Sequence, residues 1–138
     1  MQKVRLSDLP LFVRKVLEKL SIKNTAAVIA LSGELGAGKT TFVQALAREL
    51  GVKETVQSPT YVLMKKYQTT NSKFQTLVHV DLYRLEKPGE FKTLKPREFL
   101  NNPSNLVCIE WPEHAWKLLH KPDLTIKFSS DPPAGEAG

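Results

Sequence analysis

The sequence predicts an α/β fold, in which a mostly parallel central sheet is flanked by helices. An unbroken apolar run at Ala26–Leu31 has the length and composition of a buried strand. A glycine-rich turn follows it and leads into a segment whose apolar residues recur at helical spacing. Further short apolar runs then alternate with stretches long enough for helices. Strands that alternate with helices in this way usually pair in parallel.

The first expected element is an amphipathic helix behind a possible Ser7 or Asp8 cap. Its apolar stripe, which we expect to cover a sheet, consists of Leu9, Phe12, Val13, Val16, Leu17 and Leu20. The run Ala26–Leu31 is expected to be a central strand buried on both faces. A helix with one apolar face is expected over Thr40–Leu50, and Gly51 provides a natural stop.

Four further strands are expected where β-forming and apolar residues gather in short runs. These runs are Tyr61–Tyr67, Leu77–Val80, Leu106–Ile109 and Leu124–Phe128. Helices are expected over Phe91–Leu100 and Glu113–His120, although Pro96 limits the first. We expect one domain over residues 1–128 and a loose tail over 129–138, where Pro, Gly and acidic residues gather.

Composition indicates an ordinary globular protein. The hydrophobic fraction is 41% and the charged fraction 25%, so neither disorder nor a coiled coil is expected. The single cysteine, Cys108, excludes a disulfide framework or a thiol-based metal cluster and fits a reducing compartment. Residues Met1–Arg5 lack the apolar segment of a signal peptide, and no apolar run approaches the ~20 residues that span a bilayer. We therefore expect a soluble, cytoplasmic protein without a membrane partner.

The net charge of +6 makes an acidic partner plausible, and RNA, nucleotides and acidic protein surfaces all qualify. The lysines are scattered over many segments, however, and form no run of five or more. A solvated surface is the favoured explanation of such a distribution, so charge alone assigns no partner.

Residues 33–40 read GELGAGKT and match the phosphate-loop pattern G-x-x-x-x-G-K-[ST] at every fixed position. The expected nucleotide-binding residues are Gly33, Glu34, Leu35, Gly36, Ala37, Gly38, Lys39, Thr40 and Thr41. Glycines let backbone N–H groups surround phosphate oxygens, and Lys39 is placed to neutralise the β- and γ-phosphates. The Thr40 hydroxyl is the expected Mg²⁺ ligand, and Thr41 is expected to contact the α-phosphate. Because the motif joins a buried strand to an amphipathic helix, the fold is expected to be P-loop NTPase-like.

Two apolar strands end in carboxylates, at Asp81 and Glu110. A P-loop protein places an Mg²⁺-binding acid at such a strand end, and Asp81 is the first candidate, although it could simply cap a following helix. Glu110 is expected at the same sheet edge, where it could polarise the attacking water, join the Mg²⁺ shell, or pair with Arg84. The expected catalytic set is therefore Lys39, Asp81 and Glu110, and the expected metal set is Thr40, Asp81 and Glu110.

Four other residues each allow a functional and a simpler structural interpretation. Thr60, in a Ser-Pro-Thr stretch, either senses the γ-phosphate or belongs to an ordinary turn. His79 is interpreted as a hydrogen-bonded sheet residue rather than a metal ligand, because no second His or Cys stands at ligand spacing. Trp111 and Trp116 either pack on the core, which is the simpler interpretation, or contact a partner.

Four motifs in this order resemble those of the TsaE (formerly YjeE) family of small bacterial ATPases. They are GELGAGKTTF at 33–42, SPTY at 58–61, HVDLYR at 79–84 and IEWPE at 109–113. The resemblance extends from the opening helix to about Pro112. Two departures concern the sheet edge or partner docking: Leu94–Asn102 lacks a glycine expected after HxDxYR, and the chain stops soon after Phe128, where family members often continue with more strand.

The resemblance implies a role in making threonylcarbamoyladenosine beside the anticodon of tRNAs that read codons beginning with A. TsaE-like proteins bind the TsaB–TsaD complex and use ATP to support repeated cycles, while a TsaC-type enzyme makes the threonylcarbamoyl-adenylate donor. Contact with tRNA is then expected to be indirect, through the complex. By motif, Lys39 and Thr40 would hold phosphate and Mg²⁺, Thr60 would belong to a switch-like loop, and Asp81 and Glu110 would complete the metal and water site. Trp111 follows Glu110 as in the family.

The expected activity is slow, Mg²⁺-dependent ATP hydrolysis that a partner stimulates, because no arginine finger is assignable. One alternative is a small-molecule kinase on the same phosphate loop, although no Arg-rich lid segment is visible. Another is a GTP-dependent switch or a nucleotide-dependent binding module without turnover. No N-K-x-D guanine-reading motif is present, so ATP is the expected nucleotide.

Overall fold

The computed structural model describes residues 6–33, 38–56, 64–83, 87–111, 113 and 121–128. It confirms the predicted α/β class: a five-stranded sheet has the strand order β2-β3-β4-β1-β5. The strands are β1 Ala27–Gly33, β2 Met64–Gln68, β3 Thr76–Asp81, β4 Asn105–Glu110 and β5 Leu124–Phe128. Every pairing is parallel except that between β2 and β3. The sheet is therefore mostly parallel, with one antiparallel edge strand.

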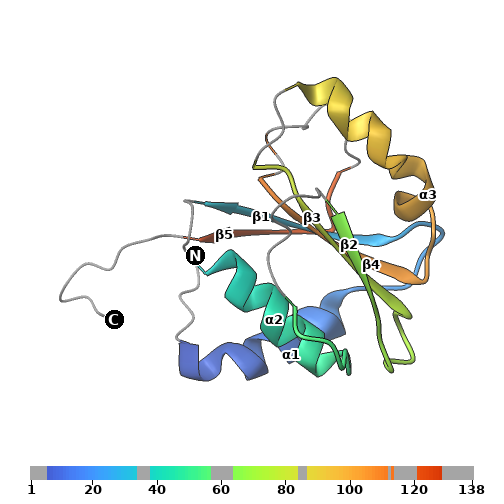
Figure 1. The fold of residues 1–138 in the computed structure, drawn as a ribbon. Helices are drawn as coiled ribbons and strands as arrows, with labels where there is room; N and C mark the ends of the chain where they lie inside the picture. The colour runs from blue at the N-terminus through green and yellow to red at the C-terminus, as the bar shows by residue number, and fades with distance from the viewer. Residues whose placement is uncertain are drawn as a thin grey trace.

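Helices cover both faces of this sheet (Figure 1). They are η1 Leu6–Asp8, α1 Leu9–Lys19, α2 Lys39–Glu49, η2 Pro88–Leu94 and α3 Pro96–Leu100. Figure 1 places α1 and α2 side by side below the sheet and α3 above it. Within the described ranges, no helix is long and apolar enough to cross a membrane.

The two long helices begin and end largely as their sequences indicate. Asp8 is the N-cap residue of α1, but its side chain makes no capping hydrogen bond, so the expected cap is only positional. A 3₁₀ turn, Leu6–Asp8, precedes it instead. Gly51 follows α2 with φ of 81° and donates its N–H to the Arg48 carbonyl at 3.1 Å, which confirms the predicted stop.

The helix predicted over Phe91–Leu100 is divided into two pieces. The 3₁₀ helix η2 ends at Leu94 and α3 starts at Pro96, with Lys95 between them at φ 55°. Pro96 causes the break, because proline lacks an N–H and disfavours the helical conformation of the residue before it. The helix expected over residues 113–120 and the tail over 129–138 lie outside the described residues, apart from Glu113.

The core has two layers, one on each face of the sheet. Side chains alternate along β3. Leu77 belongs to the layer between the sheet and helices α1 and α2, whereas Val78 and Val80 belong to the layer between the sheet and helices η2 and α3. Every residue of β4 is buried, as expected for a strand covered on both faces. This alternation puts His79 on the same face as Leu77, and therefore on the face of α2.

Gly33, the last residue of β1, is the tightest glycine position at the site. Its φ is 131°, and a Cβ atom there would lie 2.3 Å from the carbonyl oxygen of Phe128, its pairing partner in β5. We expect Gly33→Ala to lower the free energy of unfolding by roughly 2–4 kcal/mol, because it combines backbone strain with a backbone clash. Urea denaturation measures this loss.

Gly89→Ala is the matched control, since a Cβ at Gly89 would have no neighbour within 4 Å. That variant should stay within about 0.5 kcal/mol of wild type. Equal stability of the two variants would contradict the close packing of Gly33 on Phe128.

Candidate phosphate-binding site

Three strands deliver the candidate residues to one edge of the sheet. In the parallel pairing of β1 with β4, Leu31 stands opposite Glu110, and in that of β3 with β4, Asp81 stands opposite Glu110. Parallel strands end at the same edge, and ligands of open α/β folds bind outside that edge. The structure therefore brings both predicted carboxylates to the same edge as the end of β1, after which the phosphate-loop motif follows in the sequence.

The loop is anchored at both ends by glycines in conformations that side chains rarely adopt. Gly33 ends β1 at φ 131°, and Gly38 is the N-cap of α2 at φ 98°. The Gly38 carbonyl accepts the Phe42 N–H at 2.9 Å, which begins the helical hydrogen-bond ladder. Residues 34–37, which carry the other predicted loop positions, lie outside the described residues. The described ends have the geometry that a glycine loop between strand and helix requires.

Lys39 is buried at the first position of α2, with only 3% of its surface exposed. Its Nζ donates a hydrogen bond to the Gly33 carbonyl at 2.6 Å, so the ammonium is turned back onto its own loop. The same Nζ lies 4.0 Å from the ring centroid of Trp111, within range of a cation–π interaction. A buried ammonium stays charged where dipoles or other electron-rich groups surround it, and the Gly33 carbonyl and the face of the Trp111 ring are two such groups here.

Trp111 is the site residue whose contact with Lys39 the sequence did not predict. Its N–H donates to the Leu31 carbonyl at 3.1 Å, and its φ of 60° turns the chain as it leaves β4. The ring packs on the η2 and α3 core layer, 5.2 Å from the ring of Tyr83, and also against Lys39. The expected core packing is thus present, together with a contact to the buried cation. The sequence does offer a signal for this contact: Trp111 directly follows Glu110, which is itself expected at the edge of the sheet where the site lies.

The two carboxylates have different surroundings. Asp81 is partly buried, and its Oδ1 accepts the Tyr83 N–H at 3.0 Å, which forms a local turn. Glu110 is 4% exposed, and its Oε2 lies 2.5 Å from Nε2 of His79. The alternative partner considered for Glu110, Arg84, lies outside the described residues.

His79 is fully buried and hydrogen-bonded within the sheet, in agreement with the interpretation of its sequence context. Cys108, its pairing partner in β4, is also buried. Burial, and to a lesser extent the charge of Glu110, raises the pKa of the Cys108 thiol. Burial thus favours the neutral thiol, which packs as a small apolar side chain in the core.

The oxygen chemistry at this edge fits a magnesium ion that is shared with a nucleotide. Thr40 and Thr41 lie partly exposed in the first turn of α2, directly after Lys39. Across the described ranges, no three His, Cys, Asp or Glu residues cluster so that protein groups alone could hold a metal. Mg²⁺ needs no such cluster, because it takes one or two protein oxygens and fills its shell with phosphates and water. Asp81 and the Thr40 hydroxyl suit that role, whereas Thr60 lies outside the described residues.

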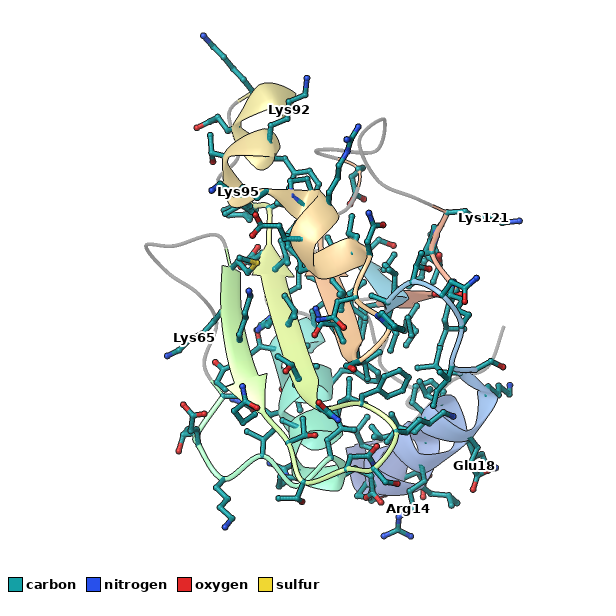
Figure 2. All side chains as sticks on the ribbon, turned by 90° about the vertical axis from the view of Figure 1, so that its right-hand side faces the viewer. Arg14, Glu18, Lys65, Lys92, Lys95 and Lys121 are labelled. Atoms are coloured by element: carbon teal, nitrogen blue, oxygen red, sulfur yellow. The ribbon has the colours of Figure 1, made fainter. Side chains whose placement is uncertain are left out.

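In the described segments, the exposed lysines are spread over separate elements rather than concentrated near Lys39. Figure 2 shows Lys65 extending outward from β2, Lys92 and Lys95 from the η2 region, and Lys121 from the segment before β5. This distribution is typical of a solvated basic surface. The buried Lys39 therefore differs from these lysines in environment and in contacts.

Comparisons with known proteins show which family this chain resembles. A family model described as "Threonylcarbamoyl adenosine biosynthesis protein TsaE" matches residues 9–136. The tRNA threonylcarbamoyladenosine biosynthesis protein TsaE of Haemophilus influenzae is 35% identical over 103 residues, which are 75% of this chain and 63% of that protein. The protein of the same name from Borreliella burgdorferi is 37% identical over 97 residues, which are 70% of this chain and 68% of that protein.

A solved structure has the same fold. The crystal structure of YdiB from Bacillus subtilis aligns with a TM-score of 0.68 and 24% sequence identity, covering 95% of this chain and 76% of that one. At 24% sequence identity, this similarity shows a shared fold and nothing about activity. The match to the Haemophilus influenzae relative leaves more than a third of that protein outside the aligned part.

Proposed function

Because the chain belongs to the TsaE family of threonylcarbamoyl adenosine biosynthesis proteins, we propose that it binds Mg-ATP and hydrolyses it slowly as an accessory subunit of the TsaB–TsaD complex. In this proposal it supports threonylcarbamoylation of the adenosine next to the tRNA anticodon, in the cytoplasm, and meets tRNA only through the complex. The observation that carries the proposal is the buried Lys39 ammonium, held on the Gly33 carbonyl at the edge where Asp81 and Glu110 end their strands.

The reaction is in-line attack of water on the γ-phosphorus, which breaks the bond to the β,γ-bridging oxygen and releases ADP and inorganic phosphate; catalysis comes mainly from positioning and charge neutralisation. Lys39 leaves the Gly33 carbonyl for the β- and γ-phosphate oxygens, so that one charge-assisted contact replaces another. Thr40 and Asp81 would hold Mg²⁺, which neutralises phosphate charge when bound. Glu110, on the neighbouring strand end, orients the attacking water.

A partner is proposed to complete the site, because the described arginines lie away from it. Arg14 pairs with Glu49 at 3.2 Å, near the far end of α2 from the loop. Arg48 lies in the last turn of that helix. Arg97 lies in α3, whose Leu100 carbonyl accepts the Ala26 N–H just before β1 begins. An arginine supplied by a partner can accelerate phosphoryl transfer by roughly 10³–10⁵-fold. We therefore expect slow hydrolysis by the isolated chain.

The test is phosphate release from Mg-ATP by this protein, alone and with purified TsaB–TsaD. Stimulation by the complex is the expected result, and fast turnover by the chain alone would count against a partner-completed site. Tight ATP binding with no turnover under either condition would favour the alternative of a nucleotide-dependent binding module. Transfer of phosphate to a small acceptor would favour a kinase, and a comparison of ATP with GTP tests the nucleotide preference.

A further inference from the structure

His79 and Glu110 are in contact in the buried part of the site. The proposed mechanism gives Glu110 a role in orienting water, but it gives His79 no role. The distance from Nε2 to Oε2 is 2.5 Å, and the side chains are 0% and 5% exposed. A hydrogen bond to a carboxylate in such a dry environment is stronger than the same bond at the surface. It therefore restricts the torsions of the Glu110 side chain.

Glu110 is the only hydrogen-bond partner of the His79 ring within the described part of the chain, because Nδ1 has none there. Burying an imidazole with one unpartnered nitrogen is costly, and an aliphatic residue at this position would avoid that cost. In the tautomer with its proton on Nε2, the ring donates to Glu110 and leaves Nδ1 as an unprotonated acceptor. The contact with Glu110 is therefore the polar interaction that accounts for a histidine at this buried position.

The strand register explains how the ring reaches the acid. His79 pairs with Cys108, and Glu110 lies two residues further along β4 on the same face, opposite Asp81. The contact therefore runs along the face of the sheet toward the edge where the strands end. Because Oε2 lies against the buried His79 ring, the contact holds the carboxylate of Glu110 in one orientation at that edge.

We propose that His79 is a positioning residue that fixes the Glu110 carboxylate for the water-attack step. This inference rests on the proposed ATPase function of the same site. His79 itself touches neither nucleotide nor water in this proposal. Loss of the contact should therefore lower kcat, since Glu110 would sample several rotamers, and should leave the KM for ATP nearly unchanged.

Three substitutions at His79 separate this role from simple filling of the core. His79→Gln places an amide nitrogen the same number of bonds from Cβ as Nε2 and keeps the donor to Glu110. His79→Asn carries the same amide one bond shorter, and His79→Leu fills the space without a donor. We expect Leu and Asn to lower kcat by roughly 10- to 100-fold and Gln to stay within a few-fold of wild type.

The measurement is steady-state ATP hydrolysis with TsaB–TsaD, together with thermal denaturation of each variant. Val78→Ala is the control for destabilisation, because Val78 is fully buried on the opposite face of the same strand. It should lose stability and keep its kcat. If kcat follows stability across all four variants, or if Gln is no better than Leu, the positioning role is overturned. A wild-type protein that releases no phosphate would overturn both proposals, whereas an active wild type with an equally active His79→Leu variant would overturn only this one.

Discussion

Replacing Lys39 by alanine is expected to reduce ATP turnover by roughly 10²–10³-fold and to weaken Mg-ATP binding. Lys39 is the buried cation at the phosphate-binding edge, held 2.6 Å from the Gly33 carbonyl. A cation that is already desolvated interacts with phosphate more strongly than a surface lysine, because little water remains to screen it. The other lysines that Figure 2 labels point outward from different elements and do not substitute for it.

Folding should be affected much less than binding. The variant loses contacts that include the hydrogen bond to the Gly33 carbonyl and the packing of Nζ on Trp111, but it also removes the desolvation cost of a buried ammonium. Titration with Mg-ATP by calorimetry and phosphate release measure the two effects, and thermal denaturation checks the fold. Lys92→Ala removes the same charge from an exposed position in η2 and should behave as wild type. If Lys39→Ala bound and hydrolysed ATP normally, the assignment of the phosphate site would be wrong.

Replacing Glu110 by glutamine is expected to lower turnover by roughly 10²-fold or more while ATP binding is retained. The substitution keeps the size of the side chain and an oxygen that can accept from His79, so the sheet should stay intact. What disappears is the negative charge that orients and polarises the attacking water. Binding of ATP depends mainly on the phosphate loop and Lys39, which are unchanged.

The magnesium dependence of this variant separates the two roles left open for Glu110. If Glu110 acts on water, the Mg²⁺ concentration for half-maximal ATP binding should match that of wild type. If Glu110 is a metal ligand, that concentration should rise, as it should for Asp81→Asn. Glu98→Gln changes an exposed acid in α3 and serves as the charge-matched control. Undiminished turnover by Glu110→Gln would remove this residue from the mechanism.

Patterns that are local in the chain were enough to predict most elements. The apolar run at β1 and the spacing in α1 and α2 each depend on neighbours within a few residues, and the structure confirms all three. The phosphate-loop motif is also a contiguous pattern. Its two described glycines, Gly33 and Gly38, lie at the end of β1 and at the start of α2, as the motif predicts. Pro96 was recognised as a limit, but the sequence did not show that a 3₁₀ helix would precede it, since 3₁₀ and α turns have similar local preferences.

The residues of β2 do not by themselves show whether this strand runs parallel or antiparallel to β3. β2 and β3 are joined by a short turn, in which Asn71 Oδ1 accepts the N–H groups of Lys73 and Phe74 at 2.7 and 3.1 Å. So short a connection cannot cross over the sheet, so the two strands must run antiparallel. The expectation of a mostly parallel sheet was correct, and this edge strand is its exception.

By itself, the sequence determined the strand and the helix that flank the phosphate-loop motif and the two carboxylates at strand ends, because residue type and spacing along the chain encode them. Only the tertiary structure decided that His79 contacts Glu110, 31 positions away, and that Trp111 lies against Lys39. Both contacts depend on which strands pair and in which register. The alternation of apolar residues in a strand decides which side chains face which layer, whereas the choice of neighbouring strand is made only when the whole sheet is buried between its two helical layers.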